Sequence, residues 1–63
     1  MNKEEFLAQL RGGLGALPLT DTEERIAFYD EMINDRMEEG LSEEEAVIAV
    51  GSVDEIVKGA LSD

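Results

Sequence analysis

Helix start and stop signals recur along this chain at short intervals, and they limit it to a few small helices. Gly40 and Gly51 each follow a helical pattern, and a glycine there is typical of a terminator with positive φ. Ser42 and Ser52 each precede a glutamate by three residues, as in a capping box. No stretch alternates apolar and polar residues with period two. The pattern therefore predicts an all-α fold without strands.

The first helical segment carries its apolar residues on one side. Asn2 and Glu5 form a capping pair at its start, and Leu17-Pro18 should terminate it. Glycines within residues 12–15 weaken its end, since glycine is a poor helix former. The apolar side spans an arc of roughly 100°, at about 100° per residue. Its members are Phe6, Leu7, Leu10 and Leu14.

The longest helix is expected over about residues 21–39, opened by a capping box of Thr20 and Glu23. Its apolar residues cover roughly half of the circumference, which is more than one neighbouring helix can cover. One stripe holds Ile26, Tyr29, Ile33 and Met37, and a second holds Phe28 and Met32. The opposite side is acidic. Arg36 lies between the stripes, and we expect it to pair with a carboxylate.

These elements predict a compact bundle of three to four helices. The long second helix is expected at its centre, and the third and fourth helices are expected to form a short C-terminal helical hairpin. The chain has 63 residues, of which 43% are apolar, so its core must be thin. Without cysteine or histidine it can form neither a disulfide nor a histidine-containing zinc site. Helix packing and capping must therefore supply its stability.

The charge of the chain is strongly acidic and unevenly distributed. It has 16 acidic and 5 basic residues, a net charge of −11, all of it carried by residues 21–63. Such a surface repels phosphate and anionic lipid headgroups, which argues against direct binding of nucleic acid or of a membrane surface. A basic protein surface would be attracted instead. Solubility alone is the alternative explanation of the charge.

No arrangement of residues predicts an enzyme, a metal site or a cofactor. Glu43, Glu44 and Glu45 occupy the first turn of a helix, where acids favour the helix dipole. The spacing of calcium ligands in an EF-hand is absent, and the glycine run follows a helix rather than a strand. Ser42 and Ser52 lack the Asp-Ser-Leu context of an acyl carrier protein. We therefore expect no catalysis, no metal and no cofactor.

The long helix carries the candidate partner-binding residues on its acidic side. Four acids lie together there without a basic residue among them, although like charges at such spacings destabilise a helix. Two apolar side chains lie at the edge of this side. We expect Phe28 to be buried, with an exposed anchor for a partner as the alternative. The candidate residues are Glu24, Phe28, Glu31, Met32, Asp35 and Glu38.

Three long segments resemble the HAAS domain, a helical signalling domain associated with helix-turn-helix regulators. They are residues 28–35, with an aromatic pair before an acidic run, residues 38–47 and residues 51–57. The opening residues 1–7 and the Leu17-Pro18 break are similar to the family as well. The resemblance covers essentially the whole chain, and one departure from it is the glycine cluster at residues 12–15.

The resemblance implies a cytoplasmic domain at the N-terminus of a bacterial membrane protein whose later segments span the bilayer. It implies a PadR-like winged-helix transcription regulator as the partner, and it carries over no catalytic or ligand residue. We therefore expect residues 1–63 to be one interaction domain of a longer protein, at the cytoplasmic face of the membrane, without an apolar run long enough to span it. The alternative is a structural or oligomerising helical module with no regulator partner.

Overall fold

The computed structural model describes residues 1–62, which form helices joined by short loops. The four helices are α1 (Lys3–Gly13), α2 (Leu19–Glu38), α3 (Glu43–Val50) and α4 (Val53–Leu61). No strand occurs among these residues. The predicted all-α fold and the long second helix are confirmed.

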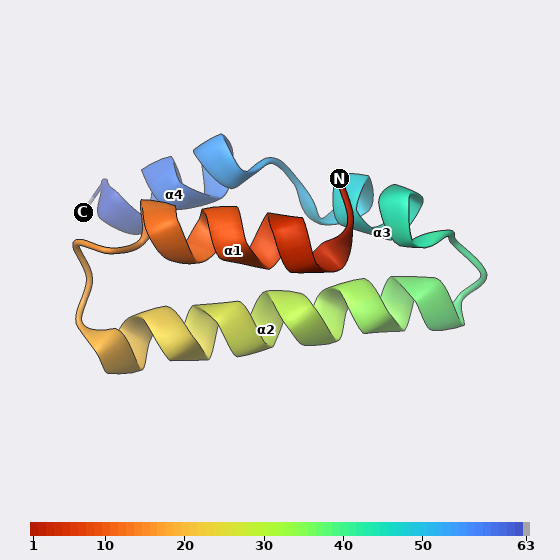
Figure 1. The fold of residues 1–63 in the computed structure, drawn as a ribbon, viewed down its shortest axis with the longest axis horizontal. Helices are drawn as coiled ribbons and strands as arrows, with labels where there is room; N and C mark the ends of the chain where they lie inside the picture. Colours follow the sequence, from red (N-terminus) through yellow and green to blue (C-terminus); the bar gives the residue numbers. More distant parts are fainter. Residues whose placement is uncertain (63) are drawn as a thin grey trace.

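Helix α1 lies between α2 and α4, and α3 packs against the end of α2 and against α1 (Figure 1). Helix α1 contacts each of the other three helices, whereas α2 packs against α1 and α3. Helix α1 therefore contacts one more helix than α2, which the sequence pattern predicts at the centre of the bundle. Helices α3 and α4 follow one another as a bent segment, and they contact α1 rather than each other (Figure 1).

The core is small and is built around α1. Three fully buried side chains come from α1 and the residue after it, and α2 and α3 contribute the others. Helix α4 has no fully buried residue and packs through half-buried ones such as Val57 and Ala60. Burying apolar surface stabilises the fold by about 25 cal/mol per Å². The buried apolar residues are Phe6, Leu10, Leu14, Ile26, Ile33, Ala46 and Val47.

Gly13 allows α4 to lie close to α1. A Cβ atom built on Gly13 would lie 2.6 Å from Cγ2 of Val57, which is closer than real Cβ contacts allow. A Cβ built on the adjacent Gly12 would meet nothing within 4 Å. The glycine that weakens the end of α1 therefore has a packing role that the sequence pattern did not reveal.

Two of the predicted capping boxes are complete. The Oδ1 atom of Asn2 accepts the Glu5 N–H at 2.8 Å, and the Glu5 carboxylate accepts the Asn2 N–H at 3.2 Å. The equivalent pair at the start of α3 has distances of 3.2 Å and 2.9 Å, with Ser42 and Glu45 as partners. At α4 only one half is present among the described contacts, from the Glu55 N–H to the serine hydroxyl before the helix. These bonds satisfy backbone donors that a helix start leaves free.

The predicted capping box at the start of the long helix is wrong. Helix α2 begins at Leu19, and Pro18 is its N-cap without a side-chain bond. Proline fixes φ near the helical value, and the Pro18 carbonyl accepts the Thr22 N–H at 3.0 Å. Thr20 therefore lies inside the first turn, and Glu23 forms an ion pair with α1 instead of reaching back.

The glycine terminators are confirmed. Gly40 has a φ of 109° and Gly51 a φ of 113°, values that side-chain-bearing residues rarely adopt. After α2, the Gly40 N–H donates to the Met37 carbonyl at 3.0 Å, and the Leu41 N–H donates to the Arg36 carbonyl at 3.2 Å. This pair of bonds is a Schellman motif, and it folds the chain back toward α3.

Candidate protein-binding surface

The outward side of α2 presents a continuous line of exposed side chains. Successive members lie three or four positions apart, so they share one side of the helix. The buried positions of α2, among them Ile26 and Ile33, lie on the opposite side. We call this line the outer stripe of α2, and Met32 lies half-buried beside it. The outer stripe consists of Glu24, Phe28, Glu31, Asp35 and Glu38.

Phe28 is exposed, with 57% of its surface accessible, so the prediction that it is buried is wrong. The reason is that α1 and α3 cover the other side of α2. The Phe28 ring packs edge-to-face on Tyr29, with centroids 5.2 Å apart, and Tyr29 packs in the same manner on Phe6 at 6.5 Å. Since Phe6 is buried in the core, this aromatic series holds an exposed ring in a defined position.

The acids of the outer stripe have no cationic partner within the described part of the chain. The ion pairs among residues 1–62 join Lys3 to Asp30, Arg11 to Glu23 and Arg36 to Glu39, which confirms that Arg36 pairs with a carboxylate. None of them includes Glu24, Glu31, Asp35 or Glu38. The outer stripe therefore combines uncompensated negative charge with one aromatic ring.

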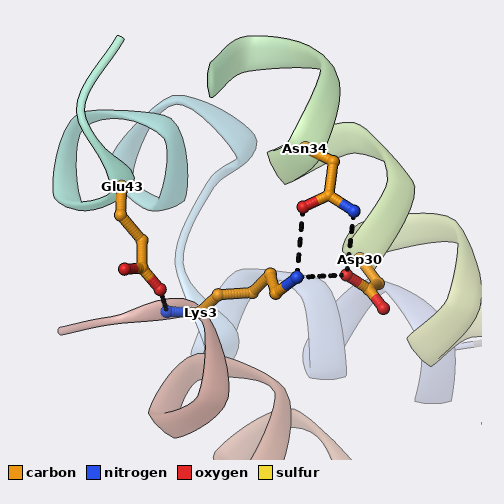
Figure 2. Close-up of polar contacts among 4 residues, drawn as sticks. All are labelled: Lys3, Asp30, Asn34 and Glu43. Carbon is orange, nitrogen blue, oxygen red and sulfur yellow. Dashed lines mark hydrogen bonds and ion pairs between the residues drawn. The ribbon is translucent and has the colours of Figure 1, made fainter. Parts of the chain in front are cut away.

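A polar cluster at the start of α1 engages two polar residues of α2, so fewer of the acidic residues of α2 are free to bind a partner (Figure 2). The Lys3 ammonium lies 2.9 Å from Oδ1 of Asp30 and donates to Oδ1 of Asn34 at 3.1 Å. The Lys3 backbone N–H donates to the Glu43 carboxylate of α3 at 2.8 Å. One residue thus ties α1 to two other helices. Asp30 and Asn34 therefore belong to this junction and not to the outer stripe.

Thr22 is a buried polar residue that no motif in the sequence indicates. It is 4% exposed, and its hydroxyl donates to the carbonyl oxygen of Leu14 at 3.1 Å. Leu14 follows α1, where carbonyl groups lack partners within the helix. The position of Thr22, four residues before the buried Ile26, is the signal that could have placed it on the core side. Its role is structural.

The perturbed carboxylates have structural causes. Hydrogen bonding to the Arg11 guanidinium lowers the pKa of Glu23 and raises the pKa of Arg11. The Ser42 backbone N–H lowers the pKa of Glu45 by donating to its carboxylate. One contact is an exposed interhelical ion pair and the other is a helix cap, and neither pairs a general acid with a base. Among residues 1–62 no group of three acids is placed to hold a metal ion.

These features define the class of the protein as a small, acidic, all-α module with an exposed charged and aromatic surface. Residues 5–59 match the model of the HAAS family, and the chain belongs to that family. It is a family of helical, non-catalytic modules associated with signalling and regulatory systems. Neither the curated proteins nor the solved structures contain a match. No helix of the described residues is long and apolar enough to cross a membrane.

Proposed function

We propose that this chain is a protein–protein interaction domain of a membrane-linked regulatory system, and that its partner is a PadR-like winged-helix transcription regulator. Membership of the HAAS family supports a signalling role. The single observation that carries the proposal is the outer stripe of α2, where an exposed phenylalanine lies among acids without cationic partners in the described chain.

The physical argument starts from what the outer stripe contributes to folding. Like charges three or four positions apart destabilise a helix by a few tenths of a kcal/mol per pair. The exposed Phe28 ring leaves apolar surface in contact with water, and its contact with Tyr29 is the one way in which it stabilises the isolated domain. A partner that covers the ring and neutralises the acids makes both features favourable. Aromatic anchors surrounded by charge are typical of such interfaces.

A regulator that binds DNA must carry a basic surface, since it neutralises phosphates. Opposite charges increase the rate of association between two such proteins and make it sensitive to salt. In this proposal residues 1–63 form one domain at the cytoplasmic face of the membrane, and a different segment of the longer protein anchors it. The domain itself binds neither DNA nor lipid.

The test uses two exposed apolar residues of α2 as a matched pair. Phe28 is 57% exposed and lies in the outer stripe, whereas Leu19 is 74% exposed at the start of the helix. We expect Phe28→Ser to weaken binding of the purified regulator at least about tenfold, which corresponds to about 1.4 kcal/mol. Leu19→Ser should leave the affinity unchanged. Equal affinities of both variants and the native chain, measured by calorimetry, would reject the outer stripe as the interface.

A further inference from the structure

A second exposed feature lies on the opposite side of the molecule from the outer stripe of α2. It is an open groove of about 430 Å³ where the bend between α3 and α4 passes over the first half of α1. Figure 1 shows the three segments that meet there. The lining includes Phe6, Val47 and Val53, and no residue of α2 contributes to it. The groove is therefore distinct from the surface proposed to bind the regulator.

The groove has a buried apolar floor and an exposed apolar rim. Phe6 and Val47 form the floor and are 1% and 4% exposed. Ile48 and Met1 form the rim and are 78% and 49% exposed. Ile48 is the most exposed large apolar residue among those described. A groove with this combination is suited to receive an apolar side chain from outside, with the rim residues closing over it.

The charged side chains at the groove are mostly acidic, and one lysine, Lys58, lies one helical turn after Asp54 on α4. Asp54 lines it directly. Glu44 and Glu45 precede Ile48 by four and three residues, so they lie beside it on the surface of α3. No arginine or lysine is among the lining residues. Three of the five basic residues, Lys3, Arg11 and Arg36, are held in ion pairs elsewhere.

This charge decides between the possible occupants. A second copy of the chain would bring another net charge of −11 to an acidic rim, which opposes self-association here. A small apolar ligand would leave the acids without partners. A helix with an apolar stripe flanked by lysine or arginine fills the floor and pairs with the rim, which is the usual arrangement of helix-in-groove recognition.

We propose that the groove between α1, α3 and α4 binds a basic amphipathic helix of a partner protein. An apolar side chain of that helix contacts Phe6 and Val47, and its basic residues face Asp54, Glu44 and Glu45. This inference does not depend on the identity of the regulator or on the outer stripe. It gives the domain two binding surfaces, so that two protein segments can be held at once.

The test uses synthetic peptides of about 14 residues, roughly four helical turns, and the ¹⁵N-labelled chain. The first peptide has leucines along one side and lysines beside them. The second has the same composition with the leucines scattered around the helix, and the third has glutamate in place of lysine. We expect the first to bind with a Kd on the order of 10 μM and to shift amide signals of Gln9 and residues 47–54. The other two should bind at least about tenfold more weakly.

Two matched variants complete the experiment. Ile48→Ser removes the exposed rim residue and should weaken the first peptide at least about tenfold, while Leu19→Ser should not change its affinity. Four results would each overturn the proposal. They are no shift with the first peptide, equal binding of the scattered peptide, shifts centred on the outer stripe of α2, and a dimer of the chain that Ile48→Ser abolishes.

Discussion

Gly12 and Gly13 are neighbours in α1 whose surroundings are opposite. A side chain at Gly13 would collide with Val57 of α4, while a side chain at Gly12 would meet nothing within 4 Å. Valine is stiff at χ1, so it cannot turn away without moving the backbone. The close contact between α1 and α4 therefore requires glycine at position 13, where alanine would place a methyl group against Val57. No fully buried side chain comes from α4, so its half-buried contacts, among them Val57 on Gly13, hold it in place.

Alanine at each of these two positions should change stability in opposite directions. Gly13→Ala should lower the free energy of unfolding by about 1–3 kcal/mol through overpacking. Gly12→Ala should raise it by about 0.5–1 kcal/mol, because alanine is the better helix former and the space is open. Urea unfolding followed by circular dichroism measures both. Changes of the same sign would show that α4 does not lie against Gly13.

The cap of α3 should make stability depend on pH through Glu45. Its carboxylate accepts the Ser42 N–H, which lowers the pKa of Glu45 in the folded state relative to its ordinary value near 4.5. A depressed pKa contributes stability above the unfolded value, and that contribution is lost as the pH falls through the folded value. The native chain should therefore gain stability over Glu45→Gln between pH 3 and pH 6, compared by urea unfolding. A difference that does not vary with pH would contradict this assignment.

At the scale of the helices, the fold was predictable because single residues mark where helices start and end. Asn2 and Ser42 marked true helix starts, and Gly40 marked a true end. The start of α2 was missed because Thr20 with Glu23 matches a capping box, whereas Pro18 begins the helix through its backbone alone. A local pattern cannot tell that Glu23 is already engaged by Arg11 of another helix.

The end of α2 provides a test at this scale. Gly40→Ala should lower the free energy of unfolding by about 1 kcal/mol, since alanine is strained at a φ of 109°. Thermal unfolding of this variant and of Gly12→Ala, which has no such φ, gives the comparison. A Gly40→Ala variant as stable as the native chain would mean that the Schellman turn is not required.

The arrangement of the helices was less accessible to sequence reasoning than their existence. The apolar arc of α2 suggested a central helix, yet part of that arc, Phe28 and Met37, remains exposed. Helix α1, whose apolar side is narrower, contacts three other helices. The outer stripe could be predicted from the sequence, because its acids are spaced to lie on one side of a single helix. The groove could not be inferred, because Phe6, Ile48 and Asp54 are brought together only by the fold.

At the scale of the whole molecule, a net charge of −11 on 63 residues opposes the compact state. The ion pairs among the described residues are exposed, and such pairs contribute little to stability. Raising sodium chloride from about 10 mM to about 150 mM shortens the screening length from roughly 30 Å to roughly 8 Å. We expect the melting temperature to rise over this range, as measured by calorimetry. A fall would indicate that attractive pairs outweigh the repulsion.

The central claim is that the outer stripe of α2 binds a basic surface of the regulator. Its most direct test is the affinity of the regulator for the native chain and for the double variant Glu31→Lys, Asp35→Lys, at low and at physiological salt. The matched control is Glu4→Lys, Glu55→Lys, which changes the net charge equally at exposed positions outside α2 and outside the groove lining. Circular dichroism establishes that each variant remains folded. We predict that only the α2 variant loses affinity, at least about tenfold, and that its binding depends less on salt. Undiminished binding of the α2 variant would contradict the account.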